Sequence, residues 1–189
     1  MSVRRILQIG DPELRRVAEP VAPDDIGAPW VVDLVDDLID TMRDADGAGL
    51  AATQIGEPWR IAVIEVTNNP RYPYKPPIPL TVAINPTIEP LDDEMVDINE
   101  GCLSVPWRGV VARHVNVRVR HLDRDGTSHD DVVRGLTAGT WQHECDHLDG
   151  LVFADRADPA TFTTWENFER FHRAAFVDRI TAFVDRIGS

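Results

Sequence analysis

Two histidines four positions apart are the first residues able to do chemistry, in the stretch His143-Glu144-Cys145-Asp146-His147. Residues i and i+4 of a helix lie on one face with Cβ atoms about 6 Å apart, so both imidazoles can bind one cation. Glu144 then projects close to the same cation, where it can move a proton. The pattern predicts a metal site on a helix, and a chance match on an ordinary amphipathic helix is the alternative.

A third ligand is expected, because a catalytic metal site typically has three protein ligands and one open position. His172 is predicted to be a solvated residue on the polar side of the last helix. Three more histidines are predicted to be surface residues of strands or turns: His114, His121 and His129. Cys102 differs, because Gly101 before it lets the backbone approach a partner closely. A small buried hydrophobic residue is the alternative for Cys102.

The elements that position these residues begin with helices, which are expected over 13–18, 29–45, 137–149 and 159–187. The second of them has Val32, Val35 and Leu38 on one face. The third carries the two histidines, and Gly150 is well placed to end it. The last has aromatic residues near helical spacing.

Strands are expected over 59–66, 80–88, 94–98, 110–122 and 127–133. The last two are predicted to pair as a hairpin across Asp123-Arg124-Asp125-Gly126, a stretch rich in turn residues. Five prolines predict an irregular surface loop over 68–79. Strands and helices do not alternate as βαβ units, so the expected fold class is α+β, in a single domain over residues 1–189.

The bulk composition excludes several classes of function. A net charge of −13 argues against general nucleic-acid binding and against attraction to an anionic membrane surface. Apolar runs are far shorter than the roughly 20 residues of a membrane helix. The first residues lack the apolar segment of a secretion signal, so a cytoplasmic protein is expected. Two cysteines cannot form a disulfide framework.

Three stretches of the chain together resemble a known family. Residues 47–54 read Gly-Ala-Gly-Leu-Ala-Ala-Thr-Gln, 100–104 read Glu-Gly-Cys-Leu-Ser, and 142–150 read Gln-His-Glu-Cys-Asp-His-Leu-Asp-Gly. In order and spacing they are similar to the G-x-G-L-A-A-x-Q, E-G-C-L-S and Q-H-E-x-D-H-L-x-G motifs of the peptide deformylases. The resemblance implies mixed or antiparallel sheets around a central helix that carries H-E-x-x-H, with a C-terminal helix.

The resemblance also implies a role for each matching residue. Cys102, His143 and His147 would hold one divalent metal ion, most often Fe²⁺ in this family, with Zn²⁺, Ni²⁺ or Co²⁺ as alternatives. Glu144 would take a proton from the attacking water and give it to the departing amine. The Gln54 amide and the Leu103 backbone N–H would meet the charge on the formyl oxygen. Without the motif, Gln54 would be expected to be an exposed loop residue.

The implied substrate is the N-terminal formyl-Met of nascent polypeptides. Gly49 and Arg108 are expected to contact the peptide, although the loop after Pro106 is one residue shorter than the common family form. The resemblance further suggests a monomer that visits the ribosome. Glu100 and Arg113 are expected either to orient the cysteine loop as a pair or to form a plain surface ion pair. Cys145 is expected to face away from the metal and pack inside.

Two departures from the family pattern concern the substrate pocket. Ala48 stands where isoleucine or valine is common, and Gly139 lies one helical turn before His143. Together they predict extra room for the methionine side chain, with simple repacking as the alternative. The last helix is expected to cover a sheet rather than to contact the ribosome or a partner. Two alternative functions are a hydrolase of other formylated or peptide substrates, and a non-catalytic metal or thiol module that uses Cys102.

Overall fold

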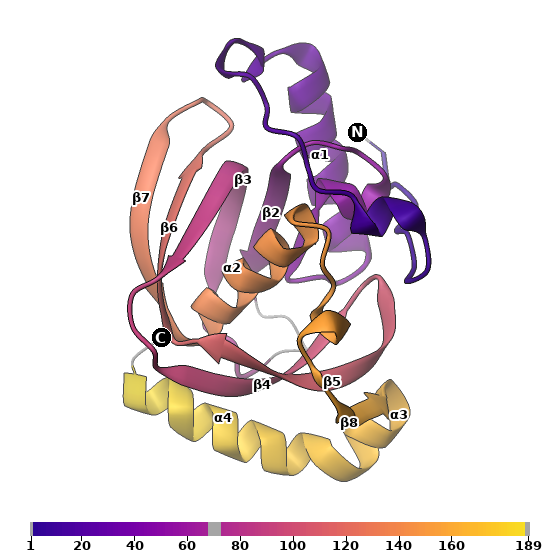
Figure 1. Cartoon of the computed structure of the whole chain (residues 1–189), viewed down its shortest axis with the longest axis vertical. Helices are drawn as coiled ribbons and strands as arrows, with labels where there is room; N and C mark the ends of the chain where they lie inside the picture. Colours follow the sequence, from indigo (N-terminus) through magenta and orange to yellow (C-terminus); the bar gives the residue numbers. More distant parts are fainter. Residues whose placement is uncertain (1, 68–72, 188–189) are drawn as a thin grey trace.

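The computed structural model describes residues 2–67 and 73–187. One helix, α2 (Gly135–Leu148), lies between two antiparallel sheets and contacts strands of both (Figure 1). The larger sheet has the order β1-β2-β3-β6-β7, with bounds Gly49–Ala51, Ile61–Val66, Ile78–Pro90, Asn116–Leu122 and Ser128–Arg134. The smaller has the order β4-β5-β8, with bounds Met95–Cys102, Val105–His114 and Asp158–Thr164. The expected α+β class around a central histidine-bearing helix is confirmed.

The helix predicted over 29–45 is α1 (Pro29–Asp44). Pro29 suits the first turn, because the backbone N–H that proline lacks has no partner there in any helix. The apolar face of α1 packs against β1 and β2 and buries Val35, Leu38 and Met42. The helix predicted over 13–18 is only a 3₁₀ turn, Pro12–Arg15, capped by the Asp11 side chain. Further 3₁₀ turns are Pro23–Asp25, Ala52–Ile55 and Phe153–Asp155.

The predicted hairpin is present as β6 and β7. The prediction of a single strand over 110–122 is wrong, because these residues belong to two strands, β5 and β6. The chain leaves one sheet at His114 and enters the other at Asn116, so Val115 marks a corner. Valines occur at alternate positions on both sides of this corner, so the sequence pattern does not indicate where one strand ends and the next begins. At the hairpin tip, Asp123 Oδ1 accepts hydrogen bonds from the backbone N–H groups of Asp125 and Thr127.

His121 was predicted at the surface, and this is wrong. It lies on the inner face of β6, where its ring packs 5.1 Å from the ring of Trp141 on α2. His114 and His129 are half-buried, and His172 is exposed as expected. The alternation that buries Val117 and Val119 also turns residue 121 inward, so the strand period indicates the observed face, and only the polarity of histidine suggested the surface.

The helix predicted over 159–187 is wrong in its first part. Residues Asp158–Thr164 form β8, which pairs with β5, because Thr161, Phe162 and Thr163 favour extended backbone. The Thr164 side chain then accepts the backbone N–H of Asn167 and starts the helical stretch. That stretch consists of α3 (Trp165–Asn167), a π-helical turn (Phe168–His172) and α4 (Arg173–Ile187).

The C-terminal helical stretch covers the smaller sheet, as expected. In Figure 1 it runs along β4 on the side away from the larger sheet. Phe168, Phe176 and Ile180 form one cluster with Val96 and Ile98 of β4. Within the described ranges, no helix has both the length and the apolarity needed to cross a membrane.

The remaining predicted strands, 59–66, 80–88 and 94–98, correspond to β2, β3 and β4. β3 begins at Ile78, so the irregular loop predicted over 68–79 ends earlier than expected. Residues 68–72 of that loop lie outside the described part of the chain.

Candidate metal centre

Cys102, His143 and His147 are brought together at the centre of the fold. Their ligand atoms all lie within 4.8 Å of one another, and Cys102 Sγ is 3.2 Å from His147 Nε2. The two histidines come from successive turns of α2, with ring centroids 5.0 Å apart. One thiol and two imidazoles in this arrangement can hold a divalent metal ion and leave a coordination position open.

The strand end before Cys102 explains how the thiol reaches α2. The pairing of β4 with β5 shifts register between Gly101 and Cys102, and such irregularities redirect a side chain. Gly101 is required there, because a Cβ would lie 2.8 Å from the Trp165 ring and 2.9 Å from the Arg108 guanidinium. The backbone of Ser104 donates to Cys102 Sγ at 3.4 Å. The close approach expected of Gly101 is therefore to Arg108 and Trp165.

The buried ion pair of Glu100 and Arg113 contacts the Nδ1 side of the His143 ring. His143 Nδ1 lies 2.9 Å from Glu100 Oε2, and both Glu100 oxygens accept bonds from Arg113 at 2.7 and 2.9 Å. Arg113 also donates to Asp146 Oδ2 at 2.6 Å. Burial would raise the pKa of Glu100, but Arg113 and His143 hold it well below its usual range. The alternative of a surface ion pair is wrong, and the carboxylate fixes the orientation of the imidazole.

Glu144 lies buried beside the three clustered groups. Burial raises the pKa of its carboxyl to about 7, while the nearby charges of His143 and Lys75 act to lower it. Within residues 2–67 and 73–187, Oε2 of Glu144 has no hydrogen-bond partner. The backbone of Gly49 lies against the Glu144 side chain, and a Cβ at Gly49 would lie 2.9 Å from Glu144 Cγ. Glu144 lines a pocket together with Gln54, Cys102 and His143. Its carboxyl group therefore has an unused acceptor oxygen beside these residues and a pKa near neutrality.

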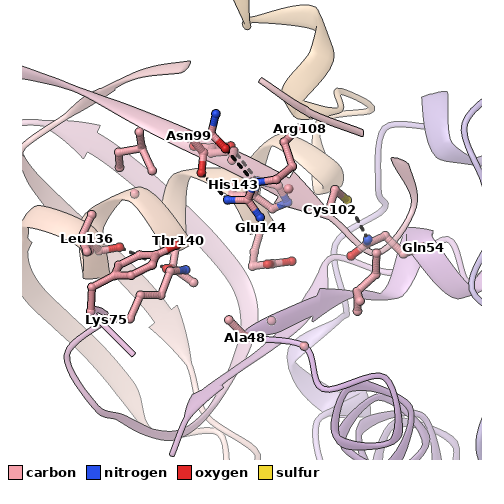
Figure 2. Close-up of a pocket in the computed structure, with 18 residues that line it drawn as sticks. Ala48, Gln54, Lys75, Asn99, Cys102, Arg108, Leu136, Thr140, His143 and Glu144 are labelled. Carbon is pink, nitrogen blue, oxygen red and sulfur yellow. Dashed lines mark hydrogen bonds and ion pairs between the residues drawn. The ribbon is translucent and has the colours of Figure 1, made fainter. Parts of the chain in front are cut away.

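Gln54 is buried, so the alternative of an exposed loop residue is wrong. Its Oε1 accepts the Ala51 backbone N–H at 2.9 Å, which orients the amide. Its Nε2 donates to Ser104 Oγ at 3.0 Å. It also donates to Cys102 Sγ at 3.5 Å (Figure 2). The amide N–H groups of Gln54 therefore point toward the cysteine, and Leu103 lines the same pocket.

Arg108 reaches the pocket wall but is held by other residues. Its guanidinium donates to Asn99 Oδ1 at 2.7 Å and to the Asn99 carbonyl oxygen at 2.6 Å. It stacks between the rings of Trp165 and Phe168, at 4.4 and 4.2 Å from their centroids. Only 2% of Arg108 is exposed, so its position is fixed before any ligand binds.

The pocket has lining residues that the sequence patterns did not single out: Tyr74, Lys75, Asn99 and Thr140. Thr140 follows Gly139 on the face of α2 that carries His143, so helical spacing gave a usable signal for it. Lys75 and Tyr74 lie in the proline-rich segment, where no periodicity exists. Their position depends on the path of the whole chain.

The extra room predicted at Gly139 is occupied. Both Ala48 and Gly139 line the pocket, but a Cβ on Gly139 would lie only 2.6 Å from Ile98 Cδ1. The space that glycine leaves is therefore filled by Ile98, which agrees with the repacking alternative. Cys145 is buried on another face of α2, and burial raises the pKa of its thiol to about 12. A neutral buried thiol agrees with the expectation that Cys145 packs inside.

Comparisons with known proteins agree with this geometry. A family model described as polypeptide deformylase matches residues 3–162. Peptide deformylase 2 of Ralstonia nicotianae is 46% identical over 160 residues, which cover 84% of this chain and 89% of that protein. Peptide deformylase 1 of Prochlorococcus marinus is 45% identical over 165 residues, covering 86% and 85%.

Solved structures that are similar to this chain are also peptide deformylases. The Met-Ala-Ser-bound class I type b peptide deformylase from Acinetobacter baumannii superposes with a TM-score of 0.79 at 36% identity, covering 82% of this chain and 98% of that one. The peptide deformylase from Thermotoga maritima gives a TM-score of 0.74 at 32% identity, covering 84% and 100%. On sequence, fold and site alike, the chain belongs to the polypeptide deformylase family.

Proposed function

We propose that this protein removes the formyl group from the N-terminal formyl-Met of nascent polypeptides and releases formate. The observation that carries the proposal is Glu144, a buried carboxylate with an unused oxygen, beside Cys102, His143 and His147. Family membership supports the reaction, and a related deformylase from Acinetobacter baumannii has Met-Ala-Ser bound. That tripeptide is the product expected from a formylated Met-Ala-Ser.

The three clustered groups are proposed to hold one divalent metal ion, with Fe²⁺ as the native ion. A thiolate and two imidazoles suit iron, zinc, nickel and cobalt, so Zn²⁺, Ni²⁺ or Co²⁺ can replace it. The Glu100 carboxylate at His143 Nδ1 leaves the other ring nitrogen for the cation, which supports the assignment. When bound, such an ion lowers the pKa of water toward neutrality and polarises a carbonyl oxygen.

Glu144 is proposed as the group that moves the proton. It accepts a proton from water as the water oxygen attacks the formyl carbon, and then donates it to the departing amine. A pKa near neutrality suits both steps, because the carboxyl must give and take a proton at the same pH. The pKa of about 7 that burial confers on Glu144 supports this assignment.

Backbone and amide groups are proposed to bind the substrate. The Gln54 Nε2 and the Leu103 backbone N–H would donate to the formyl oxygen as negative charge develops on it. Gly49 would present backbone groups to the peptide, and its closeness to Glu144 agrees with that role. Arg108 would form part of the wall that the peptide meets, fixed by Asn99 and two aromatic rings.

We further propose that residues 1–189 act as a single catalytic domain, as a cytoplasmic monomer that meets nascent peptides near the ribosome. The relatives named above support the domain assignment, since the matched region covers 89% and 85% of their lengths. Light scattering of the purified protein tests the monomer, and co-sedimentation with ribosomes tests the association.

The test of the reaction is formate release from formyl-Met-Ala-Ser by anaerobically purified, metal-loaded protein. Glu144→Gln should retain the metal and lose about 100-fold or more in kcat, because general acid–base catalysis contributes that much. Glu89→Gln, a change at a carboxylate with 59% of its side chain exposed, is the matched control and should leave kcat unchanged. No formate from metal-loaded wild type would overturn the proposal.

A further inference from the structure

The indole ring of Trp165 lies over Gly101, the residue before Cys102 in the chain. A Cβ at Gly101 would lie 2.8 Å from Cζ2 and 3.2 Å from Cη2 of this ring. Both atoms belong to the six-membered ring of the indole, at the far end of a half-buried side chain. The ring therefore occupies the space in which a side chain at residue 101 would lie.

The same ring contacts Arg108. The guanidinium carbon of Arg108 lies 4.4 Å from the ring centroid of Trp165 and 4.2 Å from that of Phe168. Asn99 of β4 also holds the guanidinium, because it accepts hydrogen bonds of 2.7 Å at Oδ1 and 2.6 Å at its carbonyl oxygen. Trp165 is therefore linked to β4 at two points, directly at Gly101 and through Arg108 at Asn99.

Both contacts lie where the regular pairing of β4 with β5 ends. Gly101 and Arg108 are paired across these strands, and they form the last regular pair before the register shifts at Cys102. A shift of this kind disrupts the ladder locally, so the strand end that follows it has less support from backbone pairing. Trp165 contacts both members of the last regular pair. The ring therefore supports the point from which the Cys102 thiol extends toward α2.

The strand β8 brings Trp165 to this place. Thr163 of β8 pairs with Arg108, and Thr164 then caps the helical stretch that begins at Trp165. Figure 1 shows α3 at the end of β8, beside the smaller sheet. The match to the family model ends at residue 162, so Trp165 lies after the matched region.

We infer that Trp165 is a positioning residue that fixes the end of β4 and, through it, the thiol of Cys102. The ring covers Gly101, which has no side chain of its own to pack, and it holds the Arg108 side chain that is bonded to β4. A fixed strand end keeps Cys102 Sγ 3.2 Å from His147 Nε2. A ligand group that is already in position loses less freedom when a cation binds, so the affinity for the cation is higher. This effect on affinity rests on the proposed metal binding, whereas the positioning of the thiol does not.

A purely structural role for Trp165 makes a different prediction. A ring that only added buried apolar surface would stabilise the whole chain and leave the local mobility of Cys102 in the folded protein unchanged. Trp165→Ala removes the contacts with Gly101 and Arg108 together. Trp165→Phe keeps an aromatic ring but lacks the Cζ2 and Cη2 atoms that reach Gly101. The two variants therefore separate loss of the ring from loss of its reach.

The experiment measures the rates at which iodoacetamide alkylates the two cysteines of the metal-free protein, with each site identified by mass spectrometry. Cys102 reports on the strand end. Cys145 is only 2% exposed and burial raises the pKa of its thiol to about 12, so its rate reports on unfolding of the whole chain. We expect Trp165→Ala to raise the Cys102 rate by about tenfold or more, and Trp165→Phe by a smaller factor. Phe171→Ala, a change at a ring of the same stretch that is 61% exposed, is the control and should leave both rates unchanged.

An increase in the Cys102 rate of Trp165→Ala that is no larger than the increase in its Cys145 rate would overturn the inference. Global unfolding exposes both thiols, so it would then account for the whole effect. An increase confined to Cys102 would support the inference, because only local opening of the strand end exposes one thiol without the other.

Cobalt binding gives a second readout that does not depend on activity. Loss of a group that supports a metal ligand typically reduces metal affinity by about 10–100-fold, so Trp165→Ala should bind Co²⁺ at least about tenfold more weakly than wild type. Titration followed by the thiolate-to-Co²⁺ absorption band measures the affinity, and equal affinities would overturn the inference. If wild type binds no Co²⁺, the proposed metal binding fails, and the alkylation rates still decide the role of Trp165.

Discussion

Glu144, which is buried, and Lys75, which is half-buried, carry opposite charges, and their pKa values are linked. Burial is the main cause that raises the Glu144 pKa to about 7, and the Lys75 cation acts in the opposite direction. The Glu144 carboxylate in turn raises the pKa of Lys75, which burial lowers to about 8. At the residue scale, each group therefore affects whether the other is charged at neutral pH.

Lys75→Met should move the acid limb of the pH profile to higher pH. Removal of a nearby cation raises the pKa of Glu144, so a higher pH is needed to ionise the proposed base. A metal ion lowers that pKa in both proteins, so the direction of the difference persists. The measurement is kcat/KM for formyl-Met-Ala-Ser against pH, and the two profiles should converge above pH 8, where wild-type Lys75 loses its charge. A limb displaced to lower pH would contradict this assignment.

Glu100→Gln tests the ion pair behind His143. The change leaves Arg113 buried without its full charge partner, so we expect a loss of about 3–5 kcal/mol in the free energy of unfolding of the metal-free protein. The weakened support of His143 should also reduce metal affinity by about 10–100-fold. Urea unfolding and chelator competition measure the two effects.

Glu89→Gln provides the comparison for that experiment. Glu89 pairs with Arg120 at 3.4 Å, and both side chains are about half exposed. An exposed pair of this kind contributes about 0–1 kcal/mol, so both stability and metal affinity should stay near wild type. Equal losses in the two variants would mean that burial of Glu100 has no special effect.

At the scale of elements, the sequence predicts those parts whose signal is local. The helix that carries His143 and His147 is one such part, since helical spacing and Gly150 define it. The start of the C-terminal helix is not, because the strand Asp158–Thr164 depends on pairing with the distant strand β5 in addition to its local preference for extended backbone. Lys75 could not be placed from a segment without periodicity, since its contact with Thr140 joins residues 65 positions apart.

The C-terminal stretch offers a matched pair of aromatic residues. Phe168 is 3% exposed and contacts both the smaller-sheet cluster and Arg108, whereas Phe171 is 61% exposed. Phe168→Ala should lower the free energy of unfolding by about 3–5 kcal/mol, as expected for a buried phenylalanine. Phe171→Ala should change it by about 0.5 kcal/mol or less. Urea unfolding of the two variants checks this, and similar losses would contradict the view that this stretch covers the sheet through one face.

At the scale of the whole molecule, the candidate metal ligands connect elements that are far apart in sequence. Cys102 ends β4 in the smaller sheet, while His143 and His147 lie on α2. The same helix packs its Ala138 and Trp141 against strands of the larger sheet. A cation bound by all three groups would therefore tie the smaller sheet to the helix on which the larger sheet also packs.

Metal removal should for that reason lower the stability of the whole chain and not only its activity. An ion that binds the folded but not the unfolded chain stabilises it by about 2.7 kcal/mol at 100 times its Kd. For a chain of this size, that corresponds to a fall in Tm of about 5–10 °C when a chelator is added. Calorimetry of metal-loaded protein, with and without chelator, measures the difference.

Two variants decide which groups hold the ion. Cys102→Ala should abolish the effect of the chelator, because only two of the three clustered groups remain. Glu144→Gln should retain the full effect, because a group that moves protons without binding the ion leaves its affinity intact. A chelator effect that survives in Cys102→Ala but disappears in Glu144→Gln would reverse the two roles. Glu144 would then hold the ion, and the proton would have to be moved by another group in the pocket.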